Sequence, residues 1–316
     1  MLSFEPATPF GSRHLAGLFS TAPMRAVFSE RNALQSMLDV EVALASVQAR
    51  LGLIPAEAPA AIARAARAEN LDLDELAAGT LRAGLPIVNL VEQLVRLTGP
   101  AYGEFVHWGS TSQDIMDTAL MLQVRAAFGI IESDLLRLIS AIAALALRHR
   151  NTPMVARTKL QHALPTTFGF KAAIWLSALL RHKQRLSEVK PRVLQVQVAG
   201  AVGNFASLEA AGPDVRAMLV AELDLGEPLI AWHVMRDTLA ETVAFLGLLS
   251  SSLSNRCCAA HATRNWRSSR TGRRRPWRIQ HHAAQAQSDH LRADHRRRHR
   301  ASTSGGCDAR CVCPRP

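Results

Sequence analysis

Apolar residues recur at helical spacing along most of the first 255 residues, and this pattern predicts an all-α protein. Residues 30–51 form the clearest early helix, and Gly52 followed by Pro55 favours its end. Shorter helices are expected over about 59–69, 73–81 and 87–97. Together these elements predict a helical N-terminal domain over residues 1–105.

A much longer helical pattern follows. Residues 112–150 contain no Pro and a single glycine, Gly129, and either Thr111 or Ser112 can cap the start. At 1.5 Å per residue such a helix is roughly 55 Å long, which is typical of a long bundle. Two further long helices are expected, one over about 166–189 that stops at Pro191 and one from about 235 to at least 250. These predict a central helical bundle over residues 106–255.

Composition agrees with helices for the first part of the chain and changes abruptly near residue 255. Hydrophobic residues make up 48% of the chain and aromatic residues 5%, which favours helices packed through Ala and Leu over a β-sandwich. Residues 256–316 carry fifteen Arg, no Lys and all five Cys, with a net charge of +12, whereas the first 255 residues have a net charge of −1. The last segment is therefore expected to be a disordered tail.

Targeting signals are not evident in the sequence. No run of about 18 apolar residues is present to form a transmembrane helix. The N-terminus lacks the basic start and apolar core of a signal peptide. The expected location is the cytoplasm.

Three irregular segments at the starts of helices carry the candidate chemistry: His107–Asp114, Arg157–Pro165 and Trp232–Asp237. Each places hydroxyls, amides, His or Arg beside helix N–H groups, an arrangement that suits carboxylates and other anions. In any one segment the hydroxyls could serve only as helix caps. Three such segments in one chain favour a shared site for an anionic ligand.

The amino-acid sequences of these segments resemble those of a known superfamily. The strings HWGSTSQDIMDTA, RTKLQHALPTTFGFKAA, GAVGNFASL and WHVMRD occur in this order, within a resemblance that runs from about residue 18 to 255. They are similar to the fumarase/aspartase superfamily, and most closely to its 3-carboxy-cis,cis-muconate cycloisomerase branch. The resemblance implies a helical N-terminal domain followed by a long-helix bundle that is incomplete in this chain.

The resemblance also implies an activity. Members form homotetramers with each active site built from three subunits, and they make or break a bond β to a carboxylate through an aci-carboxylate intermediate, with neither cofactor nor metal ion. For this branch the substrate is a small polycarboxylate, 3-carboxy-cis,cis-muconate, which closes to 4-carboxymuconolactone in protocatechuate breakdown. An adenylosuccinate lyase-like β-elimination enzyme is the alternative. Membrane and nucleic-acid partners are not expected.

The resemblance implies roles for the residues of this chain that match the superfamily's motifs. The residues expected to bind substrate carboxylates are Ser110, Thr111, Ser112, Gln113, Thr158, Gln161 and Arg236. His107 and His162 are titratable near neutral pH and are candidates for proton transfer, although each could instead cap or pack at a helix start. Lys159 is a third catalytic candidate. Relatives that cleave argininosuccinate or adenylosuccinate have His at that position, which argues against those substrates and leaves the proton donor open.

The superfamily's mobile loop, which reads roughly GSSxMPxKxN and supplies the usual catalytic Ser, does not occur in this reading frame. Residues 276–294, back-translated and read one nucleotide later, can encode RGGSSTMPHKRNPITCEPI. This match predicts a frameshift near residue 255, an out-of-frame tail and a chain that is inactive or impaired.

Two other interpretations of the tail are nucleic-acid binding by its Arg clusters and metal binding by its Cys residues. No folded module accompanies the Arg clusters, and the Cys and His spacing of a zinc site is not formed, so neither is expected.

Overall fold

The structure, a computed structural model, describes residues 11–12, 14–158 and 161–270, with side chains described up to residue 254. Contacts divide the chain into two units, Met1–Ser254 and Asn255–Pro316. Helices dominate the described part, as the sequence predicts, and a single two-stranded sheet accompanies them there. Among the described residues, no helix is both long enough and apolar enough to cross a membrane.

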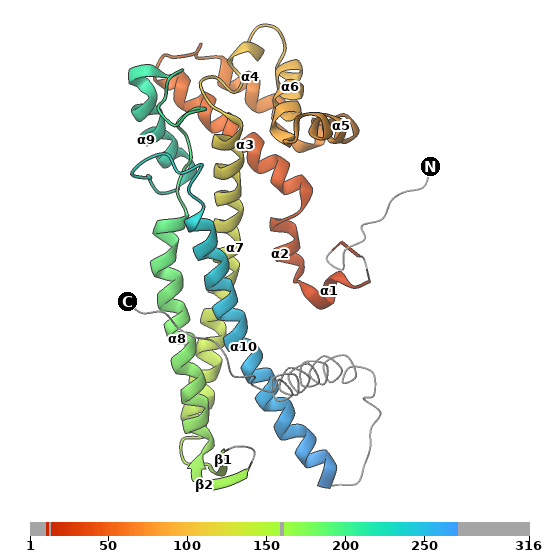
Figure 1. Cartoon of the computed structure of the whole chain (residues 1–316), viewed down its shortest axis with the longest axis vertical. Coiled ribbons are helices and arrows are strands. Elements are labelled where there is room, and N and C mark those ends of the chain that lie inside the picture. Colours follow the sequence, from red (N-terminus) through yellow and green to blue (C-terminus); the bar gives the residue numbers. More distant parts are fainter. Residues whose placement is uncertain (1–10, 13, 159–160, 271–316) are drawn as a thin grey trace, which may run out of the picture. The chain divides into compact units, whose positions relative to one another are not determined.

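The N-terminal part is a set of mostly short helices around one long one (Figure 1). The elements are α1 (Ala16–Phe19), α2 (Ala22–Val27), α3 (Glu30–Arg50), α4 (Ala58–Ala65), η1 (Ala68–Asn70), α5 (Leu73–Ala83), α6 (Pro86–Thr98) and η2 (Gly103–Phe105). Local sequence explains their ends. The Ser29 hydroxyl accepts from the Asn32 N–H at the start of α3, and Gly84 ends α5 in the left-handed region.

The longest described helices form the bundle. They are α7 (Ser112–Arg148), α8 (Phe168–Val193) and α10 (Asp237–Arg270), and the shorter η3 (Glu209–Ala211) and α9 (Gly212–Leu223) lie between α8 and α10 in sequence. Helix α8 passes through Pro191, where the sequence predicts its end, and stops two residues later at Val193. Pro191 has no N–H to donate to the carbonyl four residues before it, so the helix lacks a backbone bond there. The α9 helix was not predicted from the sequence.

The last helix also extends further than the sequence predicts. Disorder was expected from residue 256, whereas the backbone remains helical to Arg270. Residues 256–270 contain neither Pro nor Gly, and the first helix breaker after them is Gly272. The predicted tail beyond this point, residues 271–316, lies outside the described residues.

A β-hairpin connects α7 to α8 at the end of the bundle far from α3 (Figure 1). Strand β1 (Pro153–Thr158) pairs antiparallel with β2 (Gln161–Thr167), from Pro153 opposite Thr167 to Thr158 opposite Gln161. The sequence predicts an irregular segment here, because the alternation of side chains is short and both strands are largely exposed.

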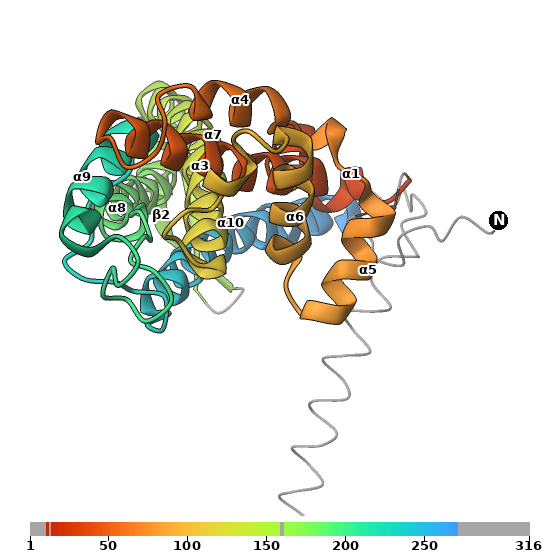
Figure 2. The same cartoon turned by 90° about the horizontal axis from the view of Figure 1, so that it is seen from above.

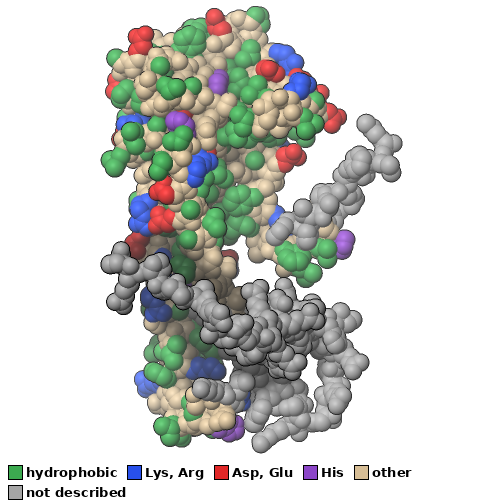
Figure 3. Space-filling view, in the orientation of Figure 1, with side chains coloured by type: hydrophobic (Ala, Val, Ile, Leu, Met, Phe, Trp, Pro, Cys, Tyr) green, Lys and Arg blue, Asp and Glu red, His purple; other side chains and the backbone are tan. Residues whose placement is uncertain are grey.

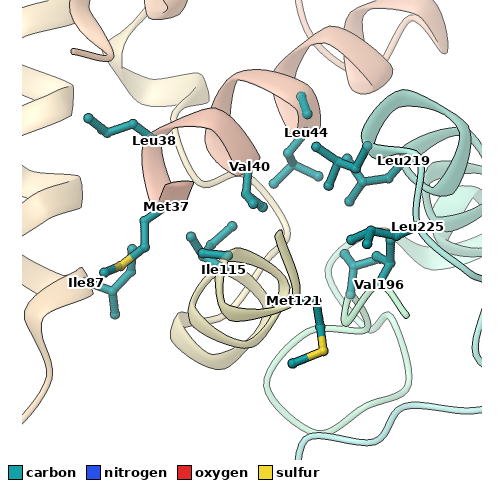
Figure 4. Packing of buried hydrophobic residues seen from close by; sticks show 14 of the residues in the cluster. Met37, Leu38, Val40, Leu44, Ile87, Ile115, Met121, Val196, Leu219 and Leu225 are labelled. Carbon is teal, nitrogen blue, oxygen red and sulfur yellow. The ribbon is translucent and has the colours of Figure 1, made fainter. Parts of the chain in front are cut away.

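One hydrophobic core joins the N-terminal helices to the bundle. Helix α3 packs against α7, α9 and α4, and α5 and α6 lie at the side of the molecule away from α9 (Figure 2). Leu38 and Val40 of α3, Ile115 of α7 and Leu219 of α9 are all at most 1% exposed and belong to the same cluster (Figure 4). The boundary predicted near residue 105 therefore does not separate two cores.

Candidate active site

The segment that precedes α7 is a tight turn with an unusual backbone. His107 has a φ of 61° and Gly109 a φ of 71°, both in the left-handed region. A Cβ at Gly109 would lie 2.4 Å from Cδ2 of Leu208, so a side chain there would clash as well as strain the backbone. The Ser110 N–H and hydroxyl both donate to the His107 carbonyl, at 3.3 and 3.0 Å. The turn places residues 110–113 at the positive end of the long helix α7.

A buried carboxylate ties this turn to a loop distant in sequence. Asp114 is 1% exposed. One of its oxygens accepts from the Thr111 N–H at 3.1 Å and the Gly200 N–H at 2.8 Å. The other accepts from Gln197 Nε2 at 3.0 Å and the Ala199 N–H at 3.2 Å. The start of α7 and the loop carrying GAVGNFASL are therefore held together by one side chain.

The same loop contacts the WHVMRD segment. The Gln197 side-chain oxygen accepts from the Trp232 N–H at 2.8 Å, and Trp232 Nε1 donates to the Val196 carbonyl at 3.0 Å. Thr118 of α7 donates to the Gln197 carbonyl at 2.8 Å. Three of the four recognised motifs thus converge on a buried polar network near the N-terminal end of α7.

Arg236, expected to bind substrate, is engaged within the chain. Its guanidinium makes two bonds to Asp117, at 2.6 and 2.9 Å, and a third to the His233 carbonyl at 3.2 Å. The Asp117 side chain is 6% exposed and that of Arg236 is 43% exposed. The hydrogen bonds that Arg236 donates to the Asp117 carboxylate raise the pKa of Arg236 above its ordinary value, so the guanidinium stays charged. The pair fixes Arg236 beside the start of α7 and α10.

His107 is held by a carboxylate of α3. Its Nδ1 lies 2.6 Å from Oε1 of Glu41, a side chain that is 1% exposed. Burial acts to lower the pKa of His107, but the hydrogen bond and charge of Glu41, with the charge of Asp114, outweigh it and raise that pKa above the ordinary 6.5. The imidazole is therefore a cation over more of the neutral pH range than a free histidine.

The hairpin residues lie far from this cluster in one chain. Thr158 and Gln161 pair at the tip side of the hairpin, and both are exposed together with His162. Lys159 lies outside the described residues. The 37 residues of α7 separate the hairpin from the 107–113 turn by roughly 55 Å (Figure 1). The structure therefore brings the first, third and fourth motifs together and leaves the second at the opposite end of the bundle.

Sequence reasoning missed three buried polar residues of this site: Glu41, Asp117 and Gln197. Glu41 gave a signal, because it stands among apolar residues on the buried face of α3, where a carboxylate without a partner is costly. Gln197 gave none, since its importance comes from contacts with residues far apart in sequence. Among the residues whose side chains are described, no group of three or more His, Cys, Asp or Glu could hold a metal ion.

Comparison with known proteins shows the family. Residues 19–258 match the family described as Lyase. The chain belongs to this lyase family, within the fumarase/aspartase superfamily. It is 48% identical over 238 residues to a 3-carboxy-cis,cis-muconate cycloisomerase of Pseudomonas aeruginosa, which covers 74% of this chain and 52% of the relative.

Solved structures give the same result. A fumarate lyase from Mesorhizobium sp. BNC1 superposes with a TM-score of 0.72 at 50% identity, over 75% of this chain and 56% of that one. A 3-carboxy-cis,cis-muconate lactonizing enzyme from Pseudomonas putida gives a TM-score of 0.74 at 44% identity, over 76% and 55%. The chain thus spans about half the length of the relatives it matches.

Proposed function

We propose that the protein to which this chain corresponds is a cytoplasmic cycloisomerase that closes 3-carboxy-cis,cis-muconate to 4-carboxymuconolactone. The observation that carries the proposal is the identity of 44–48% to proteins named for this reaction, over the part of the chain that contains the turn at the N-terminal end of α7. Those names favour lactonisation over an adenylosuccinate lyase-like β-elimination.

The chemistry that such a site must perform is limited. One substrate carboxylate oxygen forms a C–O bond to an alkene carbon, and the displaced electron pair moves onto a neighbouring carboxylate to give an aci-carboxylate. A proton then adds to the carbon next to it, so the overall change is an isomerisation. Ser110, Thr111, Ser112 and Gln113 would bind the carboxylates at the start of α7, where the helix dipole favours negative charge.

The remaining groups would come from elsewhere. Arg236, fixed by Asp117, adds positive charge near the same end of α7. Thr158 and Gln161 would bind a carboxylate from the hairpin, and His162 and Lys159 remain candidates for proton transfer together with His107. No cofactor or metal ion is required in this scheme, because every step is a proton or carboxylate rearrangement.

The distance between the turn before α7 and the hairpin supports an assembly of several copies of the chain. A small polycarboxylate cannot span the roughly 55 Å between the turn and the hairpin of one chain, so a complete site needs the hairpin of another copy. Large apolar side chains at the surface of the long helices are consistent with such packing (Figure 3). They include Leu147, Phe170, Ile174, Leu180, Val243 and Leu248. We propose a homotetramer with shared active sites.

We also propose that the gene contains a frameshift near codon 255 and that this chain has impaired activity as a result. The support is the shifted reading of residues 276–294, which lie outside the described residues. Resequencing across codons 253–256 should reveal one extra or missing base. An unchanged sequence in independent isolates would show that the basic tail is genuine.

The activity test compares the chain as it is with a chain in which the frame is restored. Lactone formation from 3-carboxy-cis,cis-muconate is followed by loss of substrate absorbance, and light scattering gives the oligomeric state. The restored chain should be a tetramer that forms lactone, with the present chain much slower. Cleavage of adenylosuccinate in preference would overturn the proposal. Salt-dependent DNA binding that disappears on deleting residues 256–316 would instead support the basic-tail alternative.

A further inference from the structure

Two buried polar side chains of α3 form hydrogen bonds with the turn before α7. Glu41 and Gln48 are seven residues apart and therefore lie on the same side of the helix. The Glu41 carboxylate bonds the His107 imidazole at 2.6 Å, and Gln48 Nε2 donates to the Trp108 carbonyl at 2.7 Å. Both are at most 2% exposed in a helix face that is otherwise mainly apolar. Buried polar groups are costly unless their contacts serve the fold or the site.

The two contacts differ in what they can do. Gln48 is neutral and holds the backbone of the turn, so its role is positional. Glu41 brings a carboxylate into the core; its second oxygen, Oε2, is buried with no hydrogen-bond partner among the described residues, as is Oε1 of Gln48. A neutral side chain could position an imidazole equally well. The presence of a carboxylate therefore points to control of the charge on His107.

Charge decides which ligand the imidazole can accept. Nδ1 of His107 is committed to Glu41, so Nε2 is the nitrogen that remains to bond a ligand. In a neutral ring that donates from Nδ1, Nε2 has a lone pair and repels a carboxylate oxygen. In the imidazolium, Nε2 carries a proton and donates to it with the added attraction of a full charge.

We propose that Glu41 is a positioning residue of the active site, which fixes His107 by Nδ1 and keeps it as an imidazolium whose Nε2–H binds a carboxylate of the substrate. The inference rests on the proposed function only for the identity of the polycarboxylate. The charged groups that act on His107 are Glu41 from α3 and Asp114 from α7, both negative, so the described surroundings on both elements favour the protonated ring. The backbone of His107 is strained, with a φ of 61°. Such a conformation persists only where surrounding contacts hold the residue in place, as the bond to Glu41 does here.

The decisive variant is Glu41→Gln in the full chain, because Gln retains the size and an acceptor oxygen but removes the charge. Histidine ring carbons are followed by NMR, with His107 assigned from the signal missing in His107→Gln. The titration midpoint of His107 should fall in Glu41→Gln, because the carboxylate that favours the protonated ring is gone. An unchanged midpoint would overturn the inference, whatever the binding results.

Binding is measured by calorimetry across pH with two probes, 3-carboxy-cis,cis-muconate and propane-1,2,3-tricarboxylate. For the unaltered chain, affinity should be highest at low pH and should fall as the pH rises through the His107 midpoint, because the cationic donor is lost. Glu41→Gln should bind about tenfold more weakly near neutral pH and regain affinity at about pH 5.5, where solvent protonates the ring. A purely structural role for Glu41 would not give recovery at low pH.

Gln48→Met is the matched control, since it removes the hydrogen bond from α3 to the Trp108 carbonyl without changing the charge. It should lower thermal stability but leave the pH at which affinity is lost unchanged. If the tricarboxylate binds with this Glu41 dependence while carboxymuconate is not converted by the frame-restored chain, the proposed function fails and the role of Glu41 stands. If neither probe binds to the unaltered chain at low pH, the carboxylate-binding role of His107 is wrong.

Discussion

The Asp114 carboxylate provides the sharpest test of how the site is held together. In Asp114→Asn, one acceptor oxygen becomes an NH2 group of nearly the same size. Each oxygen of Asp114 accepts two bonds, so in either amide orientation two N–H donors face a new donor and lose their acceptor. A buried donor left without an acceptor costs about 1–3 kcal/mol, which gives a destabilisation of about 2–6 kcal/mol.

Urea unfolding followed by circular dichroism, at one fixed protein concentration, measures this change in the free energy of unfolding. Asp134→Asn is the matched control on the same helix, because Asp134 is 55% exposed in its pair with Arg137 and such pairs contribute little. A loss below about 1 kcal/mol for Asp114→Asn would refute the reasoning, since it would mean that water or a shifted loop supplies the missing acceptors.

Two further predictions concern the same region. Gly109→Ala combines a left-handed backbone with a contact of 2.4 Å to Leu208, so it should destabilise the chain by about 1–3 kcal/mol in urea unfolding. Gly129→Ala, in the interior of α7 with no atom within 4 Å of the new Cβ, should stabilise by about 0.5–1 kcal/mol, and a loss there would contradict the helical account. Arg236→Gln leaves the Asp117 carboxylate buried without its cation and should lower both the melting temperature and tricarboxylate affinity. In a double-mutant cycle with Asp117→Asn the stability losses should fall short of additive, and strict additivity would show that the pair is not coupled.

The sequence predicts the long helices well because their signals are local. The range expected for the longest one, 112–150, differs from α7 only at its last turn, and a cap residue and the absence of proline were sufficient evidence. The hairpin and α9 were not predicted, since their side-chain patterns are short or weakly periodic. Where a pattern covers only a few residues, tertiary contacts decide the structure.

In the candidate site, too, local sequence signals could be predicted and contacts between distant residues could not. The motif residues from 107 to 113 could be named from their order along the chain, but their supports could not. Asp114 stood only as the last residue of the first segment, and the structure shows it bonding a loop more than 80 residues away. Arg236 was named as a substrate ligand without its partner Asp117, because an ion pair separated by 119 positions leaves no mark on either local sequence.

The length of α7 has a consequence for how mutations combine. Under the proposed assembly, a copy with a damaged turn and a copy with a damaged hairpin each carry one intact half of a site. Mixed oligomers of the two would regain some complete sites that neither parent forms alone. Conversely, a single defective copy would harm sites that it shares with normal partners, so the effect of an allele depends on which other allele is expressed beside it.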